Sequence, residues 1–288
     1  MKEDMTATCK LNNGVEIPCV GLGTLRSDNL YDAIRYAIDI GYRHIDTAEF
    51  YKNEDVVGQA VKDSGIPREQ LFITTKVWPL YLNEAEAQIQ ASLKRLKMDY
   101  ADLYLIHWPG VDIDARHKAW DVINEYQQKG AIRACGVSNF SADHLEELIA
   151  YSGAVPADDQ VELHPYNAQK ETRAYCEGKG IAVTAWGPLF HGHLSEVPLM
   201  AELGSKYGKT PGQVTLRWHL QKGNIIIPKS STKERIYENI QLFDFALSDE
   251  DMQRIDALDG TASYAMDNHT FDGDLEKLAA HRKKQEGK

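Results

Sequence analysis

The stretch at residues 43–54, RHIDTAEFYKNE, decides the fold because it ends a short apolar run on an ionisable side chain. Asp46 closes the strand-like segment RHID, and Tyr51 follows five residues later. Two further runs end in the same way, since LFITTK reaches Lys76 and ADLYLIH reaches His107. This repeated pattern predicts parallel strands whose carboxyl ends meet at one end of the fold.

Short apolar runs alternate with helical patterns along the chain. Segment 9–18, CKLNNGVEIP, predicts a β-hairpin turning at Asn-Asn-Gly. Eight strand-like runs follow, each with a helical pattern behind it, which predicts parallel strands joined by right-handed crossovers. The runs lie at 19–23, 43–46, 71–77, 101–107, 131–138, 159–163, 181–186 and 224–228, and the clearest helical patterns at 29–41, 84–97, 116–130 and 141–153.

Eight such units without a reversal favour an α/β fold, the closed (β/α)8 TIM barrel, with the N-terminal β-hairpin closing the barrel bottom. A doubly wound open sheet is the alternative. The turn GLGTLR at 21–26 lacks the last glycine of G-x-G-x-x-G, so the dinucleotide-binding turn of Rossmann folds is absent. No linker divides the chain, so we expect one domain over residues 1–288, with a frayed tail at about 275–288.

Composition narrows the class of protein. The 288 residues are 43% hydrophobic and 26% charged, as in soluble globular proteins. A net charge of −11 argues against nucleic-acid or anionic-membrane partners. No apolar run reaches about 18 residues and no signal peptide is apparent. Four scattered cysteines predict reduced thiols in a cytoplasmic protein, with one disulfide pair as the alternative: Cys9, Cys19, Cys135 and Cys176. We also expect a monomer.

The side chains at the strand ends suggest acid–base chemistry at the barrel mouth. Each one alone has an ordinary explanation as a cap, a solvated cation or a local hydrogen-bond partner. Together they make a set: the phenol of Tyr51 has an ordinary pKa near 10, and the Lys76 ammonium would lower it. Asp46 would hold Lys76 in place, and His107 would orient a polar substrate atom.

Tyr51 would then act as a general acid that protonates a carbonyl oxygen. Proton transfer of this kind is typically worth about 10²–10⁴-fold in rate. None of these side chains supplies reducing equivalents, so a cofactor must donate the hydride.

Several longer motifs resemble those of the aldo-keto reductase superfamily, in consistent order from VGLGT near the start to LSDEDMQRIDALDG near the end. They are DTAEFYKNE, TKVW, DLYLIHWP, GVSNF, QVELHPY and IPKSSTKERIYEN. The chain is similar to prokaryotic members of the 2,5-diketo-gluconate reductase kind. By that resemblance Asp46, Tyr51, Lys76 and His107 form the catalytic tetrad. The family binds NADPH across the barrel mouth, which explains the missing glycine fingerprint.

The resemblance also implies cofactor and substrate contacts. Ser138, Asn139 and Gln160 would bind the nicotinamide carboxamide, and Trp186 would stack on its ring. Lys229, Ser230 and Arg235 offer two cations and a hydroxyl to the 2′-phosphate. Glu238 and Asn239 would contact the adenine, with Thr24, Asp46, Leu189 and Ser231 as further cofactor residues. The substrate, a small carbonyl compound with some apolar surface, would meet Tyr51, His107 and the apolar walls Phe50, Trp78 and Trp108.

Three departures from the family pattern concern the site. Phe190 replaces the usual glycine of the pyrophosphate loop, so which amides meet the pyrophosphate is open. Leu25 stands where many members carry an aromatic pocket residue. The tail after Gly260 is short, which predicts a reduced carboxyl-terminal specificity loop.

Two other interpretations remain beside a reductase. His44 with Asp46, or the H-x-H of His191 and His193, could suggest a metallohydrolase, but no matching carboxylate or histidine set is evident at other strand ends, so no metal is expected. The second alternative is a non-catalytic NADPH-binding regulatory or structural protein on the same fold. An intact acid–base set favours catalysis.

Overall fold

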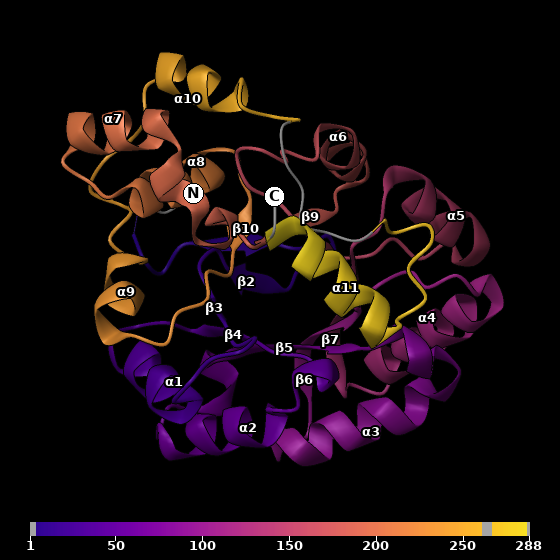
Figure 1. The fold of residues 1–288 in the computed structure, drawn as a ribbon. Coiled ribbons are helices and arrows are strands. Elements are labelled where there is room, and N and C mark those ends of the chain that lie inside the picture. Colours follow the sequence, from indigo (N-terminus) through magenta and orange to yellow (C-terminus); the bar gives the residue numbers. More distant parts are fainter. Residues whose placement is uncertain (1–3, 261–266, 287–288) are drawn as a thin grey trace.

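The computed structural model describes residues 4–260 and 267–286, and parallel strands form its centre (Figure 1). Strands β3 to β10 hydrogen-bond in chain order, each neighbouring pair being parallel. Parallel bridges join Val20 to Ile226 and Gly23 to Lys229, so the first strand meets the last and the barrel closes. The TIM-barrel prediction is confirmed, and the open doubly wound sheet is wrong because the strand order never reverses.

The elements agree closely with the sequence pattern. The strands are β1 Thr8–Lys10, β2 Glu16–Pro18, β3 Leu22–Gly23, β4 His44–Asp46, β5 Phe72–Val77, β6 Ala101–Ile106, β7 Ile132–Ser138, β8 Asp158–Glu162, β9 Ala182–Trp186 and β10 Ile225–Ile226. The α-helices are α1 Leu30–Asp39, α2 Glu54–Asp63, α3 Ala85–Leu96, α4 Ile113–Gln128, α5 Ala142–Ser152, α6 Lys170–Lys179, α7 Pro198–Tyr207, α8 Pro211–Gln221, α9 Lys233–Glu238, α10 Asp249–Asp256 and α11 Leu275–Glu286. Short 3₁₀ helices are η1 Glu49–Tyr51, η2 Arg68–Gln70, η3 Pro79–Glu84 and η4 Phe190–Glu196.

The strands are apolar on both faces because helices cover the outside and side chains fill the inside. Every residue of β5 and β6 is buried. Along β6, Tyr104 and Ile106 pack outward in a cluster that includes residues of α4, whereas Leu103 and Leu105 belong to the cluster inside the barrel. This two-residue alternation also fixes which side chains point into the mouth at the carboxyl ends.

Gly23 allows the first and last strands to meet. A Cβ at this position would lie 2.8 Å from the carbonyl oxygen of Ile227, closer than real Cβ contacts come. The glycine of the GLGT motif therefore serves barrel closure rather than the dinucleotide turn of a Rossmann fold.

The N-terminal hairpin closes the bottom of the barrel, as predicted. Its strands pair antiparallel, with Cys9 opposite Ile17. Ile17 and Leu11 are buried in one cluster with Phe72 and Ile225, which lie on barrel strands. The apolar face of this short hairpin is thus buried against the amino ends of the barrel strands, which stabilises it.

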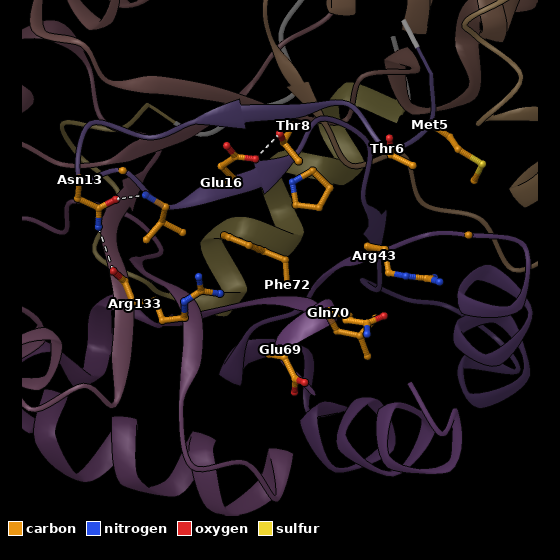
Figure 2. Close-up of a pocket in the computed structure, with 15 residues that line it drawn as sticks. Met5, Thr6, Thr8, Asn13, Glu16, Arg43, Glu69, Gln70, Phe72 and Arg133 are labelled. Carbon is orange, nitrogen blue, oxygen red and sulfur yellow. Dashed lines mark hydrogen bonds between the residues drawn. The ribbon is translucent and has the colours of Figure 1, made fainter. Parts of the chain in front are cut away.

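A pocket of about 760 Å³ lies between this hairpin and the amino ends of the strands (Figure 2). Thr8 and Glu16 border it from the hairpin, and Arg43, Phe72 and Arg133 border it from the barrel. Both arginines are engaged: Arg43 donates to backbone carbonyls and Arg133 pairs with a buried aspartate. The pocket is at the end opposite to the predicted tetrad, so it is not the site that the sequence indicates.

The four cysteines are free thiols. Cys135 and Cys176 are buried apart from the hairpin, whereas the sulfur atoms of Cys9 and Cys19 lie 2.9 Å apart beneath the barrel. Cys9 and Cys19 are therefore the pair that the disulfide alternative concerns.

The carboxyl-terminal segment differs from the predicted frayed tail. Residues from Leu275 to Glu286 form helix α11, whereas 287–288 lie outside the described residues. Leu278 is buried in a cluster with Trp78, Trp108 and Phe271. In Figure 1, helix α11 overlaps the barrel strands in the view shown. This packing holds the helix, whose own sequence is mostly polar.

Candidate active site

The carboxyl ends of β4, β5 and β6 bring the ionisable side chains together. The ammonium Nζ of Lys76 lies 2.7 Å from Oδ1 of Asp46 and donates to the carbonyl oxygen of Thr47 at 2.9 Å. Lys76 is fully buried, and Asp46 is 2% exposed. Lys76 is in register with Leu105 on β6, whose side chain faces the barrel interior. The ion pair therefore lies inside the barrel, out of contact with bulk water.

Burial and charge act in opposite directions on Lys76. Loss of hydration lowers the pKa of the Lys76 ammonium, and the carboxylate of Asp46 opposes this shift. Because the Asp46 carboxylate is the strongest of the groups that raise the pKa of this ammonium, the charge on Lys76 at neutral pH depends on that contact.

Tyr51 and His107 complete the group at the mouth. Helix η1 ends at Tyr51, and the Lys76 Nζ lies 5.1 Å from the centre of the Tyr51 ring. The rings of Tyr51 and His107 are 5.6 Å apart at an angle of 74°. His107 is 7% exposed. The structure thus brings all four predicted tetrad residues into one cluster, while their catalytic roles stay predictions.

The residues predicted for the nicotinamide carboxamide are hydrogen-bonded to this cluster. Gln160 donates from Nε2 to Oδ2 of Asp46 at 2.8 Å, and Asn139 donates from Nδ2 to the carbonyl oxygen of His107 at 2.9 Å. The indole of Trp186 donates to Oδ1 of Asn139 at 2.8 Å. Asn139 has φ of 62°, a left-handed conformation that asparagine tolerates better than most residues. The amides and the indole are therefore held in fixed orientations.

Two hydroxyl groups border the same cluster. Thr24 donates to the carbonyl oxygen of Asp46 at 2.9 Å, and Ser138 donates to the carbonyl oxygen of Gln160 at 2.6 Å. Both side chains are buried. With their protons engaged by the main chain, these oxygens can still accept a hydrogen bond from a bound group.

The predicted phosphate residues lie beyond β10. Ser230 and Thr232 form a hydroxyl-centred turn before α9, with the Thr232 amide 3.3 Å from Oγ of Ser230. Ser231 accepts a hydrogen bond from the hydroxyl of Ser27 at 3.3 Å. Lys229 and Arg235 are exposed, and neither forms an ion pair with a residue that the structure describes. Two uncompensated cations in a chain of net charge −11 suit an anionic ligand.

The predicted adenine contacts lie on the far side of this turn. A Cβ on Gly212 would be 3.7 Å from both Glu238 and Leu189, so these two side chains flank the start of α8. Glu238 accepts a hydrogen bond from Thr210 at 2.5 Å. Asn239 is 4% exposed. The structure therefore places Leu189, which follows β9, with Glu238, which ends α9, and gives Asn239 little open surface.

The loop after β9 keeps a glycine-like backbone despite its sequence. Phe190 has φ of 49°, the left-handed region that the usual glycine would adopt. Its ring is buried and stacks on Tyr166, with centroids 4.7 Å apart. His191 follows with φ of 50° and Gly192 with φ of 98°. Phe190 therefore places an aromatic anchor in a left-handed turn.

Aromatic side chains surround the entrance to the tetrad. The rings of Phe50 and Trp78 stack with centroids 4.0 Å apart, and Trp78 meets His107 edge-on at 5.0 Å. Trp108 contacts Phe271 at 4.8 Å. This wall suits the apolar part of a small substrate whose polar atom faces His107.

Comparison with known proteins places the chain in a family. The model of the aldo/keto reductase family matches residues 19–260. The chain belongs to the aldo/keto reductase family. It is 47% identical to the glyoxal reductase of Bacillus subtilis over 268 residues, covering 90% of this chain and 95% of that relative. It is 41% identical to the methylglyoxal reductase DkgA of Escherichia coli (strain K12) over 268 residues, covering 92% and 98%.

Solved structures of the family share the fold. An aldo/keto reductase from Brucella melitensis superposes with a TM-score of 0.85 at 42% identity, covering 88% of this chain and 100% of that one. The AKR2E4 aldo-keto reductase of Bombyx mori, solved in complex with NADP, gives a TM-score of 0.86 at 35% identity, covering 93% and 99%. No described helix of this aldo/keto reductase has the length and apolarity needed to cross a bilayer.

The carboxyl-terminal segment contributes to the mouth of this aldo/keto reductase, which the sequence analysis did not anticipate. Trp78 donates from its indole to the carbonyl oxygen of Gly273 at 2.9 Å, and Asn268 donates to the carbonyl oxygen of Asn139 at 3.1 Å. Phe271 is 1% exposed. The signal was present in the sequence, since Phe271 and Leu278 are apolar residues within a polar tail.

Proposed function

We propose that this chain reduces the carbonyl group of an aldehyde or ketone to an alcohol, with NADPH as hydride donor and Tyr51 as the acid. The observation that carries the proposal is the buried Lys76–Asp46 pair at 2.7 Å, with the ammonium 5.1 Å from the Tyr51 ring. A structural or regulatory protein has no physical need for a buried cation beside a mouth-facing phenol.

The chemistry of Tyr51 depends on that cation. A phenol with an ordinary pKa near 10 gives up its proton slowly at neutral pH, and a nearby ammonium favours the phenolate. Asp46 keeps Lys76 charged, and His107 positions the carbonyl oxygen. As negative charge develops on that oxygen, Tyr51 supplies the proton.

The donor set fits NADPH. Bound NADPH supplies the hydride, while Ser138, Asn139 and Gln160 offer hydroxyl and amide groups to its carboxamide. Trp186 offers a ring for stacking on the nicotinamide. The exposed cations Lys229 and Arg235 match the charge of a 2′-phosphate, and the Bombyx mori relative with NADP supports the same cofactor.

For the substrate we propose a small carbonyl compound, with α-dicarbonyls as the first candidates. The names of the glyoxal and methylglyoxal reductases among the relatives support this class. The aromatic wall of Phe50, Trp78 and Trp108 supports a compound with some apolar surface. We further propose a cytoplasmic monomer, from the free thiols and the net charge of −11.

The decisive experiment measures NADPH oxidation by the purified chain with a panel of glyoxal, methylglyoxal, simple aldehydes, ketones and keto-sugars. We expect turnover with at least one small carbonyl compound. NADPH binding without turnover on any compound would overturn the reductase and favour the non-catalytic alternative.

A further inference from the structure

Two imidazoles converge on one carboxylate oxygen at the barrel mouth. Glu162 ends β8, in register with Trp186 at the end of β9. His164 follows two residues later, and His191 comes from η4 after β9. Nε2 of His191 lies 3.0 Å and Nε2 of His164 lies 3.3 Å from Oε1 of Glu162. One ligand atom from each of the three residues lies within 4.8 Å of the others.

The carboxylate of Glu162 is buried beside the two imidazoles. Its side chain and that of His164 are 0% exposed, while His191 is 34% exposed. Both imidazoles form ion pairs with this buried carboxylate in the structure. A buried carboxylate is costly unless a positive group neutralises it.

The spacing matches a metal-ligand set. Zn²⁺ binds imidazole nitrogen and carboxylate oxygen at about 2.0–2.2 Å, and tetrahedral geometry then separates neighbouring ligand atoms by about 3.3 Å. The two separations from Oε1, 3.0 and 3.3 Å, are close to that value and equally close to the length of a hydrogen bond from each imidazole, so a metal titration must distinguish the two. The other ring nitrogen of His164, Nδ1, is buried without a hydrogen-bond partner among the described residues. The described hydrogen bonds therefore leave the tautomer of His164 open.

We propose that Glu162, His164 and His191 bind a divalent transition-metal ion such as Zn²⁺, with one coordination position open toward the mouth. Two imidazoles and one carboxylate form a set that favours such ions over Ca²⁺ or Mg²⁺. The sequence analysis had set a metal aside because His191 was paired with His193 and no carboxylate was evident. The structure supplies Glu162 and His164 from another strand end instead of His193.

The loop after β9 makes the set possible. Phe190 packs its ring 4.8 Å from that of His164 and shields it from solvent. The adjacent left-handed backbone turns His191 back toward Glu162. The His191 ring is also 5.9 Å from that of Trp186, so an ion bound here would change the fluorescence of a nearby indole. The loop is the one that the family pattern assigns to the pyrophosphate, so metal binding is measured without NADPH, and its outcome does not depend on the reductase proposal.

The test is a titration of the full chain, first freed of metal with a chelator, using Zn²⁺ in calorimetry and Co²⁺ in visible absorption. We expect wild type to bind Zn²⁺ with a change in Trp fluorescence, and Co²⁺ to show the absorption of low-coordinate nitrogen and oxygen ligation. His191→Gln, on an accessible loop, should weaken binding by more than the roughly 10–100-fold that outer-shell changes cause.

Matched controls separate this set from other histidines. His193→Gln, two residues away on the same loop, should bind Zn²⁺ like wild type. His269→Gln should do the same and thereby exclude the other cluster of possible ligands, Asp143, His144 and His269. Glu162→Gln should abolish binding while remaining folded by circular dichroism, because it also removes the buried charge. No Zn²⁺ binding by wild type, equal binding by His191→Gln, or loss in His193→Gln would each overturn the proposal.

Discussion

Replacing Asp46 with asparagine isolates the ion pair at the centre of the site. The side chain keeps its shape, but the carboxylate that faces the Lys76 Nζ at 2.7 Å is lost. Lys76 is fully buried and then retains only the carbonyl oxygen of Thr47, at 2.9 Å, among its described hydrogen-bond acceptors. Breaking a buried pair in this way typically costs about 3–5 kcal/mol.

A second estimate limits that cost. In the variant, Lys76 can instead lose its proton and stay buried as a neutral amine. From an ordinary pKa of about 10.4, this deprotonation costs about 5 kcal/mol at pH 7 and about 2 kcal/mol at pH 9. In the variant the folded lysine is neutral and the unfolded lysine is charged, so the unfolded state binds more protons. Stability of Asp46→Asn should therefore rise with pH relative to wild type, up to the pKa of the unfolded lysine.

The measurement is denaturant unfolding at pH 7 and pH 9, with carbonyl reduction assayed where the variant is folded. We expect a loss of about 3–5 kcal/mol at pH 7 that shrinks at pH 9, together with a large loss of turnover because a neutral lysine does not stabilise the phenolate. Asp244→Asn is the control, since its pair with Lys209 is exposed and should contribute less than about 1 kcal/mol. Equal stability of Asp46→Asn and wild type at both pH values would refute the reasoning.

Two further substitutions test other parts of the account. Arg235→Ala should weaken NADPH binding by roughly ten- to a hundredfold and scarcely change NADH binding, because charge-assisted hydrogen bonds are worth about 1.5–3 kcal/mol. Lys233→Ala on the same helix is the control. Equal losses of affinity for NADPH and NADH in Trp fluorescence titrations would exclude the contact of Arg235 with the 2′-phosphate. Burial raises the pKa of Asp158 to about 8, so the native state keeps a proton that the unfolded chain loses above about pH 4, and this group lowers stability as pH rises toward 8. Asp158→Asn should therefore gain stability relative to wild type between about pH 5 and pH 8, by up to about 1.4 kcal/mol per pH unit in denaturant unfolding, and a constant difference would contradict the buried neutral acid.

The barrel and the cluster at its mouth were predictable because they follow from local patterns. Parallel strands covered on both faces are continuous apolar runs, so an ionisable residue at the end of a run marks the carboxyl edge. Asp46, Lys76 and His107 each end such a run, and chain order alone makes their strands neighbours.

Contacts between distant loops were not predictable in the same way. Phe271 and Leu278 pack against Trp78 and Trp108 across a long sequence separation, and a polar helix such as α11 shows little of this in its own pattern. The apposition of His191 and Glu162 depends on consecutive left-handed residues in one loop. Residues other than glycine seldom adopt a left-handed backbone, so the sequence does not predict this turn.

The measurement that tests the central claim most directly compares Tyr51→Phe with wild type in steady-state carbonyl reduction and in NADPH binding. The substitution removes only the phenolic hydroxyl and leaves the ring beside His107, 5.6 Å away between centroids. The account predicts that kcat falls by about 10²–10⁴-fold while the Kd for NADPH stays unchanged. A variant that binds NADPH normally and reduces the same carbonyl compound at nearly the wild-type rate would show that Tyr51 is not the acid.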